Sequence, residues 1–300
     1  MKKKIAVLVF CLFALFFAQA QPWMTSLDAA KRLALTQNKM IFMFWEEATF
    51  YPLPVTMRDS KGKAYFVRNL FENEGLNEII WEHFVPVIVS ERHYEDMYSK
   101  IKNKRSTRYI EKFNDDSVKI MDAAGNIINV DYNVQTYLNL SKYIQYYALN
   151  TSYLSSELSN YRRNKDFYSA YFLSSKYIDY SILTNKKIRP KILGLSKIYM
   201  SEAESYLENS DLEDEPKLKQ RVELLELKKY LIKGKPRKVL RRLKRIEKNG
   251  VIEANITNVA FLFYSSHLLL DNFDRAEAWK SKVTTFDLNK AKLVNNIHSN

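Results

Sequence analysis

The feature that most constrains the fold of this chain is a pair of short, wholly apolar runs, Met40–Trp45 and Phe84–Val89. A strand with one face in water alternates apolar and polar residues, whereas an unbroken apolar run of this length is typical of a strand buried on both faces. Six glycines and seven prolines among 300 residues are too few for a turn-dense all-β sandwich or barrel. The N-terminal half is therefore expected to hold a central sheet flanked by helices.

Helical periodicity predicts the elements around these two strands. A first helix begins behind Ser26, a residue type that caps helix N-termini, and it ends at Asn38-Lys39. The other expected elements are a helix over residues 64–81, a hairpin made of residues 117–122 and 127–130, and a closing helix over residues 134–149. Helices and strands thus follow one another as in an α/β domain, which we place at residues 22–150.

Residues 151–283 differ from the first half because they have a helical pattern almost throughout. A short polar turn precedes Phe167, Pro236 and Phe273, and each of these residues can open a second helix. Their separations of 69 and 37 residues fit two units and one unit of a repeat of about 34–37 residues. This half resembles the tetratricopeptide family, although the Trp-Leu-Gly-Tyr part of that family's consensus is absent. We expect an all-α domain of tetratricopeptide-like helical hairpins, followed by a C-terminal tail over residues 284–300.

Residues 1–20 have the three parts of a secretory signal peptide. Lys2–Lys4 are a positive start, Ile5–Phe17 is an apolar core of 13 residues, and Ala18-Gln19-Ala20 is a small-x-small cleavage site. The apolar core is short for a membrane-spanning helix, and no later stretch is long and apolar enough for one. The sequence predicts an exported protein, periplasmic or secreted and soluble after cleavage. An uncleaved N-terminal anchor is the alternative.

Cleavage of this segment would leave a chain without thiol chemistry. The only cysteine is Cys11, inside the apolar core. Thiol redox reactions, thiolate nucleophiles and cysteine-based zinc sites are then excluded, and the fold must be held by its apolar core without disulfides. Loss of Lys2–Lys4 would also leave 44 Lys and Arg against 34 Asp and Glu, a net charge of +10.

Several short motifs in residues 22–150 resemble the exported thioredoxin-like proteins. They are Trp23 before a helix, Asn38-Lys39 before a buried strand that ends in Phe44-Trp45, the run His83–Val87, and the turn Met121–Ile128. The resemblance rests on the order and spacing of these motifs rather than on any single one of them. It implies a thioredoxin-like α/β sandwich.

The positions that carry redox chemistry in that family hold other residues here. The family's Cys-x-x-Cys follows the strand that corresponds to Met40–Trp45, so Thr49 stands at the first cysteine position and Pro52 at the second. A threonine hydroxyl cannot exchange electrons as a thiolate does. The family's cis-proline before the third strand is replaced as well, here by Asp116. The resemblance thus implies a thioredoxin-like domain without redox activity and without the proline of the usual substrate groove.

The strongest charge feature is the segment 228–248, which contains 11 Lys or Arg and one acid, Glu247. A helix there would have an apolar stripe on one side and cations on the other. The cations expected on one exposed face are Lys238, Arg241, Arg242, Arg245 and Lys248. Two interpretations stay open: a solvated helix surface, or a contact surface for an anionic partner. Export makes nucleic acid an unsuitable partner, although the charge would fit it.

No residue pattern in the sequence points to a catalytic centre, a metal site or a cofactor. Glu46 and Glu47 follow the first strand but, as neighbours, point in different directions. His83 and His93 are separated by a strand and do not have the spacing of metal ligands. No nucleophile-elbow, zinc-protease or dinucleotide-binding motif occurs. We therefore expect no cofactor and no metal.

These features favour a non-catalytic, redox-inert interaction or scaffold protein of the cell envelope. Its partner would be another exported protein or an anionic envelope component. Two other classes stay open: an enzyme with a non-thiol site near Glu46–Tyr51, and a structural subunit of an envelope assembly that docks through the basic segment 228–248. Both expected folds bind peptide segments in other proteins, but this is an analogy of fold and not evidence from a site.

Overall fold

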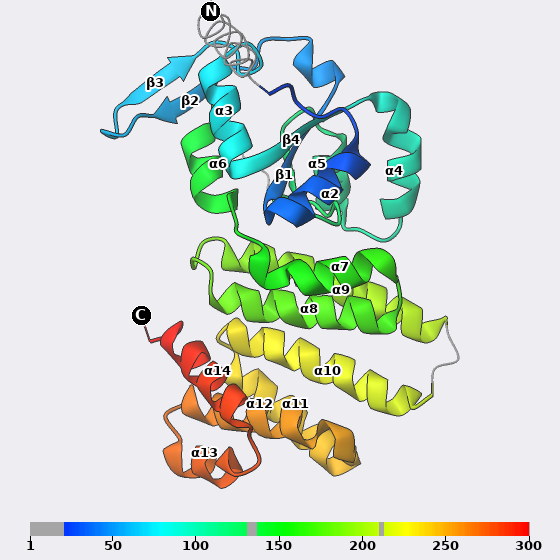
Figure 1. Ribbon diagram of the computed structural model, residues 1–300. Coiled ribbons are helices and arrows are strands. Elements are labelled where there is room, and N and C mark those ends of the chain that lie inside the picture. The colour runs from blue at the N-terminus through cyan, green and yellow to red at the C-terminus, as the bar shows by residue number, and fades with distance from the viewer. Residues whose placement is uncertain (1–20, 131–136, 210–212, 300) are drawn as a thin grey trace, which may run out of the picture. The chain divides into compact units, whose positions relative to one another are not determined.

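The computed structural model describes residues 21–130, 137–209 and 213–299 (Figure 1). The chain divides into two compact units, Met1–Thr151 and Ser152–Asn300. The first unit is mixed α/β and the second is helical, and the division falls beside the boundary expected at residue 150. The expected signal segment, residues 1–20, lies outside the described residues.

A sheet of three strands forms the centre of the first unit. β1 (Met40–Trp45) lies between β4 (Phe84–Val89), to which it is parallel, and β5 (Lys119–Met121), to which it is antiparallel. Single bridges extend the sheet at both edges, from Met24 to β4 and from Ile127 to β5. The two strands expected from the apolar runs are confirmed. All residues of β1 are buried, as an inner strand covered on both faces requires.

Local sequence signals set both ends of the helix before β1. In α2 (Leu27–Gln37) the Ser26 side chain accepts a hydrogen bond from the Ala29 N–H, and Asn38 ends the helix in a left-handed conformation (φ 56°). The helix expected behind Ser26 is therefore confirmed. Both α2 and α3 (Glu74–His83) pack against β4. The elements after β4 are η2 (Glu91–His93), α4 (Tyr94–Ile101) and α5 (Thr107–Asn114).

The helix expected over residues 64–81 is wrong in its first half. β2 (Val55–Arg58) and β3 (Ala64–Val67) form an antiparallel hairpin, and the helix α3 begins only afterwards. The sequence Tyr-Phe-Val at residues 65–67 is aromatic and β-branched, and such residues favour strands. The carboxylate of Asp59 shapes the turn by accepting two backbone N–H groups. Once β2 is available as a partner, strand pairing outcompetes the helical pattern.

The hairpin expected at residues 117–122 and 127–130 turns as predicted but has a strand on one side only, β5. The Asn129 side chain takes over the pairing on the other side. Its amide donates to the Val118 carbonyl at 2.9 Å, and its oxygen accepts the Ile120 N–H at 2.8 Å. The Ile128 N–H still donates to the Ile120 carbonyl at 2.9 Å, but beyond this bond the Asn129 side chain takes the place of backbone pairing, so residues 127–130 do not form a second strand.

The closing helix is shorter than the one expected over residues 134–149. α6 spans Leu140–Tyr147 and follows β6 (Leu138–Asn139), which pairs in parallel with β2. The side chain of Asn139 caps α6 by accepting the Lys142 N–H. Strand pairing followed directly by this cap sets the start of the helix. Residues 131–136 lie outside the described part of the chain.

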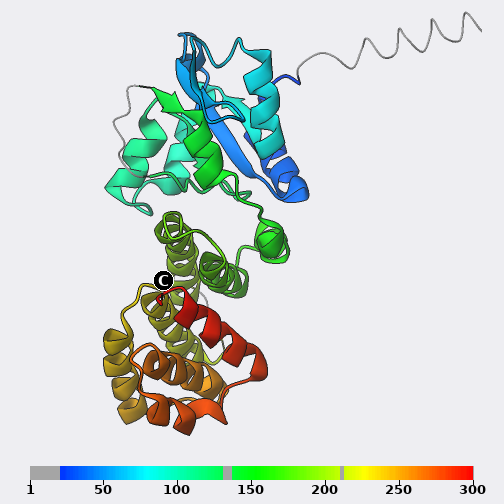
Figure 2. The ribbon, with the colours of Figure 1, turned by 90° about the vertical axis from the view of Figure 1, so that its left-hand side faces the viewer.

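The second unit consists of helices joined by short connections (Figure 2). They are η3 (Ser152–Leu154), α7 (Ser155–Arg163), α8 (Phe167–Ile182), α9 (Arg189–Glu208), α10 (Glu215–Ile232), α11 (Pro236–Asn249), η4 (Glu253–Asn255), α12 (Ile256–Leu268), α13 (Phe273–Lys280) and α14 (Thr285–Asn296). Phe167, Pro236 and Phe273 each begin a helix, as the turns before them predict. Ala170 and Ala276, the small residues three positions later, are buried, so neighbouring helices can approach closely there.

Two serines allow close packing between the long helices α8 and α9. Ser174 and Ser196 are both 0% exposed, and each hydroxyl donates to the backbone carbonyl of the other residue, at 2.9 and 3.0 Å. Near them, Tyr177 and Tyr199 stack with their ring centres 5.4 Å apart. The polar groups are thus satisfied inside an otherwise apolar interface.

Residues 284–300, expected as a tail, contain the helix α14, which packs against α12. An ion cluster whose side chains are only 13–14% exposed attaches α14 to the rest of the second unit. Asp179 of α8 lies 2.5 Å from the Lys228 ammonium of α10 and 3.0 Å from the Lys290 ammonium of α14. We call Asp179, Lys228 and Lys290 the Asp179 cluster. It joins helices that are far apart in the sequence, which explains why local periodicity did not predict the role of α14.

Candidate functional site

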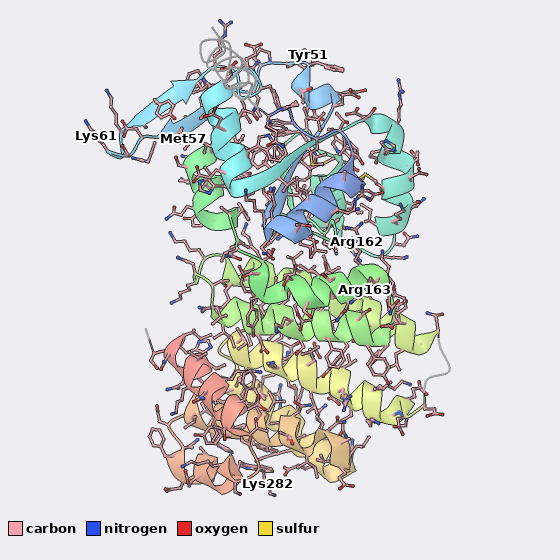
Figure 3. The ribbon with its side chains drawn as sticks, viewed as in Figure 1. Tyr51, Met57, Lys61, Arg162, Arg163 and Lys282 are labelled. Carbon is pink, nitrogen blue, oxygen red and sulfur yellow. The ribbon has the colours of Figure 1, made fainter. Side chains whose placement is uncertain are left out.

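The loop that follows β1 lies at the carboxyl end of the central sheet, where α/β proteins commonly bind ligands. It begins with η1 (Glu47–Thr49) and then exposes two aromatic side chains, Phe50 (70%) and Tyr51 (76%). Tyr51 is labelled in Figure 3. The side chains of Glu46 and Glu47 are also exposed. Water therefore solvates the two carboxylates of the alternative enzyme site.

Thr49 and Pro52, which the resemblance noted above would place at the positions of redox cysteines, do not open an α-helix. Thr49 ends η1, and its hydroxyl donates to the Glu46 carbonyl at 2.7 Å. The chain then enters β2, and the next α-helix, α3, begins only at Glu74. A low thiol pKa in a Cys-x-x-Cys depends on a helix N-terminus beside it. No α-helix begins in residues 46–73, all of which the structure describes, so no such helix N-terminus lies beside Thr49.

Asp116, which the same resemblance would place at the position of a cis-proline, is exposed in the connection between α5 and β5. Within the described ranges every peptide bond is trans. The backbone at this position therefore lacks the kink that a cis-proline would introduce.

A buried lysine that the sequence analysis did not single out lies close to this connection. Lys119 of β5 is 0% exposed, and its ammonium lies 5.8 Å from the centre of the Trp45 ring. The ammonium donates to the Asp115 carbonyl, and the Asp115 carboxylate is 3.4 Å away. Burial lowers the pKa of Lys119 to about 8, against the opposing effect of Asp115. A side chain without exposed surface cannot reach a substrate, so we assign Lys119 an effect on stability and not on catalysis.

The cations expected on one exposed face of the basic segment differ in their exposure on α11. Arg241, Arg245 and Lys248 are exposed, whereas Lys238 and Arg242 are half-buried. The expectation of a single exposed face is therefore wrong for two of the five residues. Of the five, the three exposed cations remain available to a partner, and we call Arg241, Arg245 and Lys248 the α11 basic face.

Lys238 and Arg242 are directed toward α10. The Arg242 guanidinium pairs with Glu226 at 2.7 Å and with Glu223 at 3.0 Å. Burial raises the pKa of Glu226, but the contact with Arg242 outweighs it and keeps that pKa below its usual value. The Lys238 ammonium lies 3.6 Å from the centre of the Tyr230 ring. These contacts hold α11 on α10, so both cations are structural.

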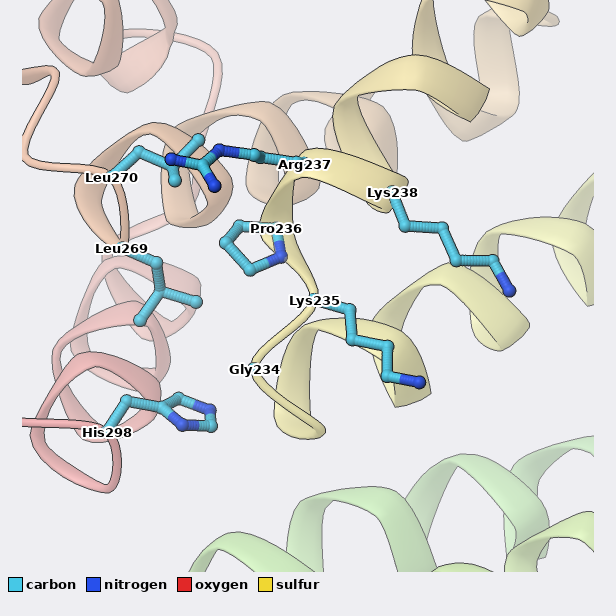
Figure 4. A pocket seen from close by; sticks show the side chains of 8 residues that line it. All are labelled: Gly234, Lys235, Pro236, Arg237, Lys238, Leu269, Leu270 and His298. Atoms are coloured by element: carbon cyan, nitrogen blue, oxygen red, sulfur yellow. The ribbon is translucent and has the colours of Figure 1, made fainter.

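A pocket of about 450 Å³ opens beside the turn between α10 and α11 (Figure 4). It is lined by the turn residues Gly234–Lys238, by Leu269 and Leu270 at the end of α12, and by His298. In Figure 4 the Arg237 side chain extends toward Leu270, while the ammonium groups of Lys235 and Lys238 point to the opposite side. The pocket thus combines hydrocarbon walls with one guanidinium.

Other site types find no support in the described part of the chain. Across residues 21–130, 137–209 and 213–299, no group of three or more His, Cys, Asp or Glu could hold a metal ion. In the same ranges none of the helices combines the length and the apolar character needed to cross a membrane.

Sequence reasoning missed Lys119, the Asp179 cluster and the pocket. For Lys119 the sequence did contain a signal, because a lysine between the apolar residues Val118 and Ile120 interrupts the pattern of a buried strand. The other two had none. Their residues come from separate helices, and no local spacing relates residue 179 to residue 290, or residue 237 to residue 270.

The structure thus defines a protein with a mixed α/β unit followed by a helical unit. Comparisons with models of protein families, with curated proteins and with solved structures found no match. The function is therefore argued from the chain's own residues.

Proposed function

We propose that this chain is a non-catalytic, redox-inert interaction or scaffold protein of the cell envelope. One observation carries the proposal: Thr49 and Pro52 occupy the redox positions of a thioredoxin-like sequence that has no cysteine beyond Cys11. The envelope location rests on the signal-peptide pattern of residues 1–20. Binding rests on the exposed aromatic and basic side chains described above.

The order of elements supports a thioredoxin-like first unit. A helix, a buried strand, a second helix and a second buried strand follow one another, and the two strands are parallel neighbours. The strand β5 then joins the sheet in the antiparallel direction. The hairpin of β2 and β3 is an addition between β1 and α3. In the second unit, helix starts at Phe167, Pro236 and Phe273 support tetratricopeptide-like hairpins.

The redox part of the proposal is tested by insulin reduction. The chain from Gln21 onward, purified free of other oxidoreductases, is expected to give no turnover with dithiothreitol or glutathione at any pH between 6 and 9, because it contains no sulfur nucleophile. A known disulfide reductase assayed beside it is the positive control. Turnover above the uncatalysed rate would contradict the proposal.

The binding part is tested by capture of partners from envelope extract. Reversal of the α11 basic face, Arg241→Glu with Arg245→Glu and Lys248→Glu, is expected to weaken partner binding at least tenfold. The three side chains are exposed, so the fold should be unaffected. Because exposed charges are screened over about 8 Å at physiological ionic strength, binding by the unchanged chain should also weaken as salt rises.

A charge-matched control comes from the first unit. Lys61, Lys63 and Arg68 are exposed as well, and their reversal to Glu changes the net charge by the same amount at a different place. This variant should bind as the unchanged chain does. A partner that is insensitive both to salt and to reversal of the α11 basic face would rule out binding through that face.

A further inference from the structure

The pocket beside the α10–α11 turn has one apolar side built from two separate segments. Pro236, the first residue of α11, faces Leu269 and Leu270, which follow α12 (Figure 4). Both leucines are only partly buried, so their side chains keep free hydrocarbon surface inside the pocket. The volume of about 450 Å³ lies within the range of about 300–1,000 Å³ that is usual for small-molecule sites.

His298 closes the pocket at one end. Burial lowers the pKa of its imidazole below the usual value, against the opposing effect of the backbone at Leu231 and Ile232. The ring packs on Gly234, where an added Cβ would lie 3.1 Å from the imidazole Cε1. Gly234 also has φ +67°, a conformation that favours glycine. The end of the chain is thereby held against the turn, which keeps the pocket walls in place.

The surroundings of the pocket are positively charged. Burial lowers the pKa of Lys233, next to the turn. The positive charges of Lys235, Lys197 and Lys238 lower it further. Arg189 and Lys186 likewise lower the pKa of His298. These cations lie on α9, on α11 and in the turn before each of these helices. An anion in the pocket would therefore be attracted by all of them.

Arg237 is the cation directed along the apolar side of the pocket. Its guanidinium extends toward Leu270 (Figure 4), and among the described residues no carboxylate pairs with it. A guanidinium presents two parallel N–H donors that match a carboxylate. The pocket therefore offers a hydrocarbon surface and an oxyanion-binding group side by side.

We propose that this pocket binds an organic anion in which a carboxylate is joined to an unbranched hydrocarbon chain. The carboxylate pairs with Arg237, and the hydrocarbon chain covers Pro236, Leu269 and Leu270. This inference is independent of the proposed interaction function, because it concerns a different surface from the α11 basic face and a small molecule instead of a protein.

Decanoate, kept below its micelle concentration, is the probe for this site. Titration calorimetry with the chain from Gln21 onward should show saturable binding, and NMR shifts should be largest at residues 234–238, 269–270 and 298. Arg237→Gln is expected to weaken binding at least tenfold. Arg275→Gln, at an exposed position of α13 outside the pocket, is the matched control and should bind as the unchanged chain does.

Two related compounds separate the contributions of charge and hydrocarbon. Decanol lacks the anion and acetate lacks the chain, so each should bind at least tenfold more weakly than decanoate. Thermal unfolding of Arg237→Gln should match that of the unchanged chain, because Arg237 is exposed. Absence of decanoate binding at millimolar concentration, equal affinity of decanol, or equal weakening by Arg275→Gln would each overturn the proposal.

Discussion

Replacing Asp179 by Asn is expected to lower the free energy of unfolding of the helical unit by about 3–5 kcal/mol. The variant keeps the size of the side chain and removes its charge. Lys228, whose pKa burial lowers, then loses the nearer of the carboxylates that oppose this effect. Lys290 keeps its contact with Asp287, 3.4 Å away. Keeping an ammonium away from water without its partner costs free energy, and the variant measures this cost.

Chemical denaturation followed by circular dichroism measures the effect, and an exposed ion pair supplies the control. Glu277 pairs with Lys280 at 2.9 Å, and its side chain is 68% exposed. Because water solvates both partners, Glu277→Gln should leave the denaturation midpoint unchanged. If Asp179→Asn shifts the midpoint no more than Glu277→Gln does, the Asp179 cluster does not stabilise the unit.

The acid limb of the stability curve gives a second readout of the Asp179 cluster. The two ammonium groups hold the pKa of Asp179 below its usual value of 3.8, although burial acts in the opposite direction. A carboxyl whose folded-state pKa is depressed stabilises the fold above its unfolded-state pKa, and this stabilisation is lost as the pH falls through the folded-state value. The unchanged chain should lose this stability below about pH 4, whereas Asp179→Asn should show a weaker dependence there.

Lys119 is expected to make the first unit more stable as the pH rises. Its pKa is about 8 in the folded chain, against 10.5 as the usual value. Between these values the unfolded chain holds a proton that the folded chain has released, so stability rises with pH. The difference between the two pKa values corresponds to about 3 kcal/mol. Relative to Lys119→Met, the free energy of unfolding should therefore rise by about this amount between pH 8 and pH 10.5.

Lys119→Met is the appropriate comparison because methionine keeps the length of the side chain and removes the titrating group. The variant should be at least as stable as the unchanged chain at pH 7, since it no longer buries an ammonium beside Trp45, and it should lose that advantage by pH 10.5. Tyr109, whose pKa burial raises to about 12, affects both proteins equally. Parallel stability curves for the two proteins across this range would show that Lys119 is not buried in its charged form.

Local signals in the sequence were sufficient for the elements that depend on neighbouring residues. Ser26 and Asn38 delimit α2, and the apolar run Met40–Trp45 is a buried strand. Phe167 and Pro236 begin helices after polar turns. A cap, a turn or an unbroken apolar run acts within a few residues, so its effect can be recognised without knowledge of the fold.

The hairpin of β2 and β3 shows where local signals fail. Residues 64–81 contain a helical pattern, yet Ala64–Val67 is a strand because β2 is its partner and β6, which begins at Leu138, pairs on the other side of β2. Strand formation depends on the partner more than on the residues of the strand itself. The same reason explains residues 127–130, where the side chain of Asn129 replaces a partner strand.

Tertiary structure determined almost entirely which residues come together in the candidate sites. The sequence alone determined that the chain beyond Cys11 has no thiol, and thereby which chemistry is excluded. It also showed the charge of the segment 228–248, but only packing against α10 separated the structural Arg242 from the exposed Arg241. Composition and short-range spacing are properties of the chain, whereas burial and ion pairing depend on which distant segments the fold brings together.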